Sequence, residues 1–170
     1  MSVFGISYGA EAALLLGVHY PTLVHGVVAL VPSATVTCAL SEPALLCLPG
    51  SLWTFEGRPI PHTRLVNNER PWDVPAARIP VERIAAPVFL NCGEQDTVWA
   101  SCRASRAIAA TRHAHHLRTE MYAYSDAGHF VGSPYLVYEP GSAIGDIFVP
   151  GDERGREDTW PRLVRFLKTY

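Results

Sequence analysis

A short stretch near the start of the chain decides its fold: Val3-Phe4-Gly5-Ile6-Ser7-Tyr8-Gly9-Ala10-Glu11. An apolar run comes first, then Gly-x-Ser-x-Gly, and then residues 12–16, which favour a helix. A serine in such a strand-to-helix turn has a strained backbone and an exposed hydroxyl, and the N–H of the next residue can face a developing oxyanion. Ser7 is therefore a candidate nucleophile and the Tyr8 amide a candidate oxyanion donor, unless the stretch is only a glycine-rich turn that Ser7 caps.

Strands and helices are predicted to alternate along the rest of the chain. Two almost unbroken apolar runs, residues 24–31 and 87–93, indicate strands that are covered on both faces, as in a parallel sheet. We expect a shorter strand at residues 120–124. Three helices are expected, at residues 10–18, 99–111 and 160–170. The pattern predicts one α/β domain over residues 1–170, with a mostly parallel sheet of about four strands flanked by helices. On the second helix we expect Arg112 to face water.

Residues 35–80 differ in composition from the rest of the chain. Prolines recur throughout this segment, at positions 43, 49, 59, 61, 71, 75 and 80. Trp53, Phe55 and Trp72 lie between them, and we expect little regular structure. Because a loop this long is unusual inside a compact domain, it is either a functional lid or binding wall, or a surface cover with aromatic anchors.

Three polar side chains are expected just beyond the ends of predicted strands. Ser7 follows the first strand, Asp96 the third and His129 the fourth. In a parallel α/β sheet, catalytic groups collect at the carboxyl ends of the strands, so we expect these side chains to converge. A serine hydroxyl needs a histidine to accept its proton, and the histidine needs a carboxylate to hold its tautomer. Ser, Asp, His is also the chain order expected of α/β-hydrolases.

Each of these assignments has an alternative. Glu94 or Asp126 could supply the acid, although Asp96 is preferred because it lies past the strand end rather than within it. His129 could be an ordinary surface histidine, but the small residues 127–128 before it favour a tight loop that presents the ring.

The histidines at positions 113, 115 and 116 also form a cluster. They follow a helical stretch and lack an acidic or cysteine partner at ligand spacing, so a solvated helix end is expected rather than a metal site. The sequence gives no reason to expect a metal or any other cofactor.

Composition limits the classes of function. The net charge of -2 and the pI near 6.4 argue against a nucleic-acid partner. The sequence has no apolar run of ~18 residues, so we expect no membrane span. The first residues lack a signal-peptide pattern, so a cytoplasmic location is expected. The cysteines form no Cys-x-x-Cys pair and are therefore expected to be reduced and mostly buried: Cys38, Cys47, Cys92 and Cys102.

Several segments spread over nearly the whole chain match one known family. They are residues 5–15, 31–33, 80–88, 93–99, 127–135 and 160–161. The most specific are Asp96-x-Val98-Trp99 and Gly128-His129-x-x-Gly132-x-Pro134-Tyr135. Through them the chain resembles the C-terminal catalytic domain of the acyl-CoA thioesterase / bile acid-CoA:amino acid N-acyltransferase family, within the α/β-hydrolase superfamily.

The resemblance implies cleavage of an acyl-CoA thioester through an acyl-enzyme, with Ser7, Asp96 and His129 as the catalytic residues. Thioesterases of the family pass the acyl group to water, whereas the transferases pass it to glycine or taurine. The transferases carry cysteine at the nucleophile position, so the serine here favours hydrolysis. An acyltransferase and an esterase of the dienelactone-hydrolase kind are the alternatives.

The family's domain has further strands before the serine, and the resemblance therefore implies an N-terminally truncated chain. The missing part would carry a second oxyanion-hole amide and would pair with the first strand, which we expect at a sheet edge. Truncation also suggests a second hypothesis, in which the chain is a non-catalytic remnant or interaction module and its open sheet edge pairs with another chain.

Overall fold

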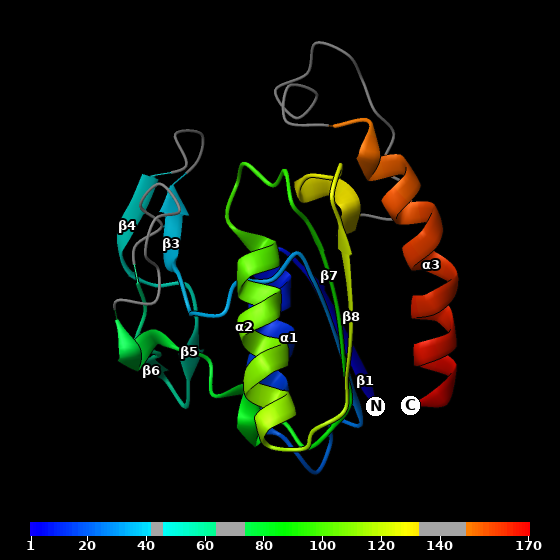
Figure 1. The fold of residues 1–170 in the computed structure, drawn as a ribbon. Helices are drawn as coiled ribbons and strands as arrows, with labels where there is room; N and C mark the ends of the chain where they lie inside the picture. Colours follow the sequence, from blue (N-terminus) through cyan, green and yellow to red (C-terminus); the bar gives the residue numbers. More distant parts are fainter. Residues whose placement is uncertain (42–45, 64–73, 133–148) are drawn as a thin grey trace.

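The core of the computed structural model is a four-stranded parallel sheet, in the order β1-β2-β7-β8 (Figure 1). The model describes residues 1–41, 46–63, 74–132 and 149–170. The strands are β1 (Ser2–Ile6), β2 (Gly26–Leu30), β7 (Val88–Gly93) and β8 (Thr119–Tyr124). Two helices cover one face, α1 (Tyr8–His19) and α2 (Ser101–Ala114), and α3 (Gly151–Thr169) covers the other (Figure 1). The predicted α/β fold is confirmed.

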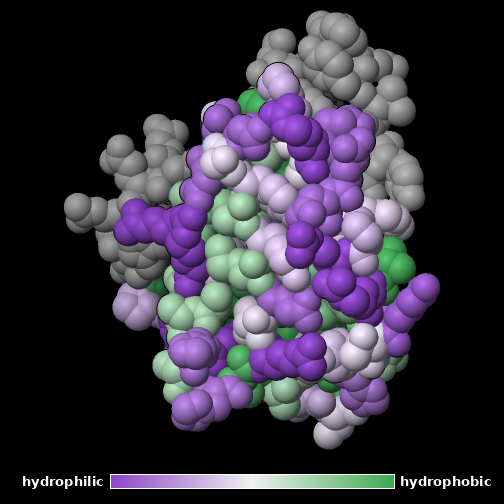
Figure 2. Space-filling view, turned by 45° about the vertical axis from the view of Figure 1, so that its right-hand side comes forward, coloured by the Kyte–Doolittle hydropathy of each residue, from purple (hydrophilic) through white to green (hydrophobic). Residues whose placement is uncertain are grey.

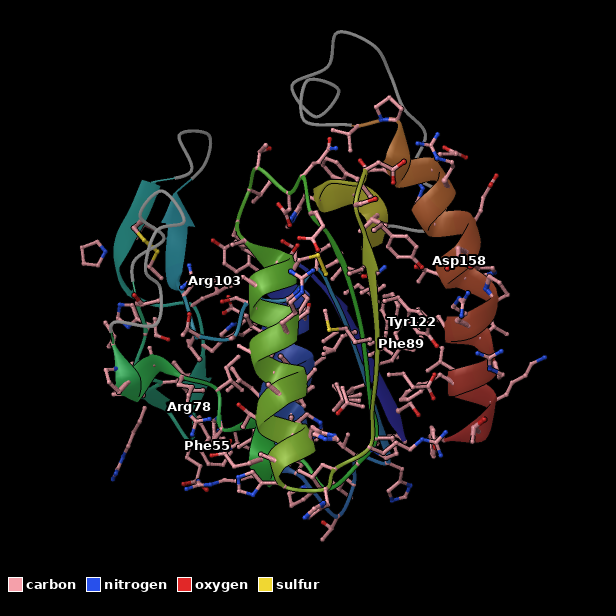
Figure 3. The ribbon with its side chains drawn as sticks, viewed as in Figure 1. Phe55, Arg78, Phe89, Arg103, Tyr122 and Asp158 are labelled. Atoms are coloured by element: carbon pink, nitrogen blue, oxygen red, sulfur yellow. A yellow bond between two sulfur atoms is a disulfide. The ribbon has the colours of Figure 1, made fainter. Side chains whose placement is uncertain are left out.

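Side chains of the central strands alternate between the two faces of the sheet. In β2, Val27 and Ala29 pack in the core beneath α1 and α2, whereas Val28 and Leu30 pack with α3. Phe89 of β7 lies in the α3 layer, with its ring centroid 5.3 Å from that of Tyr122 (Figure 3). Both faces of β2 and β7 are therefore buried, which explains why their sequences are almost entirely apolar.

The segment that follows β2 is more regular than its prolines predict. β3 (Cys38–Ser41) pairs antiparallel with β4 (Leu46–Ser51), and β5 (Thr54–Phe55) pairs antiparallel with β6 (Arg58–Pro59). Two short 3₁₀ helices follow, η2 (Pro75–Ala77) and η3 (Val81–Arg83). These hairpins lie beside α1, away from α3 (Figure 1). Pro43, Pro71 and Trp72 lie outside the described residues.

Arg112 is fully buried, so the expectation that it faces water is wrong. Its guanidinium donates hydrogen bonds of 2.7 to 3.0 Å to backbone carbonyl oxygens of Val81, Ile84, Ala86 and Arg118. Arg112 therefore ties the loops on either side of β7 to α2, and it satisfies carbonyl oxygens inside the protein. Helical periodicity could not find this role, because it depends on carbonyls remote in the sequence.

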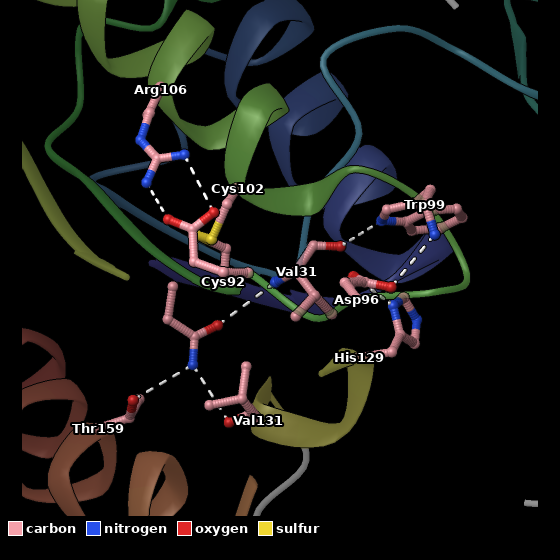
Figure 4. The surroundings of a disulfide bond; sticks show 11 residues. Val31, Cys92, Asp96, Trp99, Cys102, Arg106, His129, Val131 and Thr159 are labelled. Atoms are coloured by element: carbon pink, nitrogen blue, oxygen red, sulfur yellow. Dashed lines mark hydrogen bonds and ion pairs between the residues drawn. A yellow bond between two sulfur atoms is a disulfide. The ribbon is translucent and has the colours of Figure 1, made fainter. Parts of the chain in front are cut away.

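The four cysteines form two disulfides, Cys38–Cys47 and Cys92–Cys102, so the expectation of reduced thiols is wrong. The second disulfide joins the end of β7 to the first turn of α2 (Figure 4). Sequence spacing does not reveal this pairing, because only the turn between β7 and α2 brings the two sulfurs together. Disulfides are typical of oxidising compartments, so the state of the cysteines does not support a cytoplasmic location. That location stays a prediction.

The two edges of the described sheet differ in character. Along β8, Arg118 pairs with Glu120, and the neighbouring α3 adds the Arg162–Asp158 pair. Hydrophilic side chains cover much of the face shown in Figure 2, with apolar ones interspersed. At the opposite edge, Phe4 of β1 is 46% exposed. Charges at an edge discourage strand pairing, whereas an apolar edge favours it.

Among the described helices, none is both long and apolar enough to cross a membrane.

Candidate active site

Ser7 lies in the sharp turn between β1 and α1. Its φ of 57° and ψ of -122° are rare for a residue with a side chain, and such strain costs on the order of 1–3 kcal/mol. The Ser7 N–H donates a 3.0 Å hydrogen bond to the carbonyl of Leu30. Gly5 is required here, because a Cβ at that position would overlap the carbonyl oxygen of Gly9. The turn holds the serine in a conformation that local preferences alone would not select.

A continuous hydrogen-bonded chain joins Ser7, His129 and Asp96. The Nε2 atom of His129 lies 2.9 Å from Ser7 Oγ, and its Nδ1 atom lies 2.9 Å from Asp96 Oδ2. A histidine protonated on Nδ1 satisfies both contacts, because it donates to the carboxylate and accepts from the hydroxyl. Asp96 follows β7 and His129 opens the short helix η4 (His129–Gly132) after β8. The three side chains therefore meet at the carboxyl edge of the sheet.

The loop around Asp96 fixes the orientation of its carboxylate. Oδ1 accepts hydrogen bonds from the N–H groups of Val98, at 2.9 Å, and Trp99, at 3.2 Å, which leaves Oδ2 for the histidine. The other acids considered for this role make different contacts. Glu94 pairs with Arg106, and Asp126 pairs with Arg154 on α3. Asp96 is therefore the carboxylate that contacts the ring.

Trp99 connects the parts of the site, a role that the sequence motif did not reveal. Its indole N–H donates a 3.0 Å hydrogen bond to the carbonyl of Val31 (Figure 4). Its ring meets Tyr8 edge-on at 5.3 Å and His129 edge-on at 5.1 Å between centroids. Val31 has a φ of 44°, which is unusual for a β-branched residue. The tryptophan thus holds the elbow, the end of β2 and the imidazole in one packed unit.

The loop that carries His129 is held by residues that sequence reasoning missed. The Gly128 N–H donates a 2.7 Å hydrogen bond to Asp152 Oδ1 at the start of α3. Burial raises the pKa of Asp152 above its ordinary value. Gly93, at the end of β7, lies so close that a Cβ there would overlap the carbonyl oxygens of Ala127 and Gly128. Sequence reasoning missed Asp152 because the last helix was expected to begin at residue 160, whereas α3 begins at Gly151.

The backbone N–H of Tyr8 lies directly after Ser7, at the start of α1. Tyr8 is the first residue of α1, and the first N–H groups of a helix have no intrahelical acceptor. The helix dipole adds a partial positive charge at the same place. This geometry suits a negative oxygen beside Ser7.

Glu11 is a buried carboxylate one helical turn beyond Ser7. Its oxygens accept hydrogen bonds from the Thr37 backbone N–H at 3.1 Å, the Thr37 hydroxyl at 2.8 Å and the Trp53 indole at 3.1 Å. Burial raises the pKa of Glu11 to about 7 even though these donors favour the charged form. The carboxylate ties the segment after β2 to the helix that begins at the elbow.

The histidine cluster does not take part in this site. His113, His115 and His116 are exposed at the far end of α2. Within the described parts of the chain, no three histidine, cysteine, aspartate or glutamate side chains are arranged to hold a metal ion.

The fold is of the α/β-hydrolase type, and the chain belongs to a family within it. A model of the "BAAT / Acyl-CoA thioester hydrolase C terminal" family matches residues 1–170. Ser133, Pro134 and Tyr135 of the resembling motif lie outside the described residues.

A solved structure shares the fold. It is a putative dienelactone hydrolase from Klebsiella pneumoniae subsp. pneumoniae, with a TM-score of 0.55 and 17% identity. The match covers 98% of this chain and 51% of that chain, so this chain spans about half the length of that protein. A search of curated proteins found no match.

Proposed function

We propose that this chain is a serine hydrolase that cleaves acyl-CoA thioesters through an acyl-serine intermediate. The observation that carries the proposal is the hydrogen-bonded chain from Ser7 Oγ through the His129 ring to Asp96 Oδ2. Membership of the acyl-CoA thioester hydrolase family supports the substrate class. Serine rather than cysteine at the nucleophile position supports water as the acceptor.

The first half-reaction transfers the acyl group to the enzyme. Ser7 Oγ attacks the thioester carbonyl carbon while its proton passes to His129 Nε2. The carbonyl oxygen becomes an oxyanion that the Tyr8 N–H stabilises. The C–S bond then breaks, the thiolate of CoA takes the proton from His129, and the acyl group remains on Ser7.

The second half-reaction returns the enzyme to its first state. A water molecule gives a proton to His129 and attacks the acyl-serine carbonyl carbon. The ester bond breaks, Ser7 Oγ recovers the proton and the carboxylic acid leaves. Asp96 stays ionised throughout, because its task is to hold the ring and to stabilise the imidazolium that forms twice.

A fluorophosphonate probe tests the nucleophile directly. We expect stoichiometric labelling of Ser7, loss of labelling in Ser7→Ala, and a strong reduction in His129→Ala. Ser125→Ala is the matched control, because Ser125 is exposed and lies near the same sheet edge. Absence of labelling in the folded wild-type chain would instead support a non-catalytic module.

Substrate class and acceptor need separate assays. Release of CoA from acyl-CoA, compared with hydrolysis of short aryl esters, distinguishes a thioesterase from an esterase of the dienelactone-hydrolase kind. Adding glycine or taurine and analysing the products distinguishes hydrolysis from amide formation. We expect free acid as the main product, and an amide would point to the acyltransferase alternative.

The exposed edge of β1 supports a second proposal about partners. Phe4 lies on this strand, half exposed, and the outer backbone groups of β1 face away from β2. We propose that this edge pairs with a strand of another polypeptide. Phe4→Lys should weaken any such association, which sedimentation measurements would detect.

A further inference from the structure

An apolar cavity lies between α1 and the β5–β6 hairpin. Its volume is about 290 Å³, near the lower end of the range for small-molecule sites. The lining comes from the outward side of the helix and from the hairpin: Ala12, Leu15, Leu16, His19, Tyr20, Trp53, Thr54, Phe55 and Ile60. Most of these side chains are hydrocarbon or aromatic, so the cavity suits an apolar group rather than a charged one.

The hairpin wall of this cavity is fixed by specific contacts to α1. The Trp53 indole donates its 3.1 Å hydrogen bond to buried Glu11, which lies just before the first lining residue of the helix. At the other end, the Phe55 ring stacks on His19 with centroids 3.9 Å apart. Both ends of the wall are therefore anchored, and the space between them does not arise from a loosely placed loop.

The cavity runs along the same helix that begins at the candidate nucleophile. Ala12 is five residues beyond Ser7 and Tyr20 is thirteen residues beyond it. At 1.5 Å per residue these positions lie roughly 7 and 20 Å along the helix axis from the serine. An extended group attached to Ser7 would cover that distance, whereas a compact one would not.

We infer that this cavity is the subsite for the apolar tail of the acyl group. The inference rests on the proposed function and adds to it a position and a chain length. The cavity begins roughly 7 Å beyond the serine, so only the distal part of an acyl chain attached to Ser7 lies in it. Acyl chains long enough to span that distance and still enter the cavity are therefore the expected substrates, whereas short ones are not.

Binding of free fatty acid tests the subsite without requiring catalysis. In calorimetric titrations we expect the full chain to bind decanoate and not acetate. Leu16→Trp, which inserts a large ring into the cavity, should weaken decanoate binding at least ten-fold. Leu23→Trp is the matched control, because Leu23 is an exposed leucine just beyond α1 that does not line the cavity. Equal binding by wild type and Leu16→Trp, or none by wild type, would overturn the inference.

A variant with the opposite effect covers the possibility that Leu16→Trp does not fold. Phe55→Ala lengthens the cavity at its far end, so the preferred fatty acid should become longer by a few carbons. An unchanged preference would contradict the inference. These binding results are independent of Ser7 labelling. Decanoate binding without labelling would reject the proposed hydrolase and leave the cavity as a fatty-acid binding site only, whereas labelling without decanoate binding would reject the subsite alone.

Discussion

The Nδ1 atom of His129 lies 2.9 Å from Oδ2 of Asp96, and the Asp96 side chain is only 1% exposed. Two backbone N–H groups hold the other carboxylate oxygen, so the acid has one orientation and one free acceptor. The ring is packed edge-on against Trp99. This arrangement positions the second ring nitrogen toward Ser7 before any substrate arrives.

Asp96→Asn should lower kcat by about 10³- to 10⁴-fold with little change in stability. The amide would present an N–H to Nδ1 or leave it unpaired, which favours the tautomer that cannot accept the serine proton. Steady-state kinetics with an acyl-CoA or aryl ester gives the result. Glu94→Gln is the control, since Glu94 is an exposed acid on the same loop that pairs with Arg106. If both substitutions have the same effect, the carboxylate does not hold the ring.

The two glycines of the elbow should respond in opposite ways to alanine. Gly5→Ala should destabilise the protein by several kcal/mol, because its Cβ would overlap the Gly9 backbone. Gly9→Ala should be neutral or stabilising by up to ~1 kcal/mol, because the space around it is open and it lies in the first turn of α1. Thermal unfolding of the two variants checks this. Equal losses would mean that the turn differs from the one described.

Glu11→Gln should flatten the dependence of stability on pH. The folded-state pKa of about 7 lies above the ordinary value of 4.5, so the folded protein holds this proton more tightly than the unfolded chain does. The associated stability is complete below about pH 4.5 and is lost as the pH rises through 7, a change of about 3 kcal/mol. Urea unfolding at pH 5 and pH 8 measures it. Glutamine can still accept from Trp53 and bond to Thr37, so an unchanged slope would show that Glu11 is not the group responsible.

Removal of the Cys92–Cys102 disulfide should lower stability by about 3 kcal/mol, from the entropy of a loop with a sequence separation of 10. The double variant Cys92→Ala/Cys102→Ala is the test, with the free energy of unfolding as the measurement. The closed loop contains Asp96 and Trp99, so activity should fall as well. Thiol titration of the denatured, unreduced wild-type chain should find no free cysteine. A count of two or more would contradict the pairing.

Only the tertiary structure decided the contacts that fix the site. The indole of Trp99, the Asp152 carboxylate and the two disulfides each act on partners that sequence spacing does not indicate. Arg112 was expected at the surface from its helical position, yet it satisfies loop carbonyls inside the protein. Such roles depend on which segments the sheet brings together, and a residue type in a local pattern does not contain that information.

The sequence by itself determined the sheet and the elbow. Almost unbroken apolar runs favour strands covered on both faces, and glycines around Ser7 permit a turn that few other residues allow. Both are local properties, set by side-chain hydropathy and backbone sterics over a few residues. That Ser7, Asp96 and His129 lie within hydrogen-bonding distance is a property of the folded chain, because it requires three loops, separated by up to 122 residues, to end at one sheet edge.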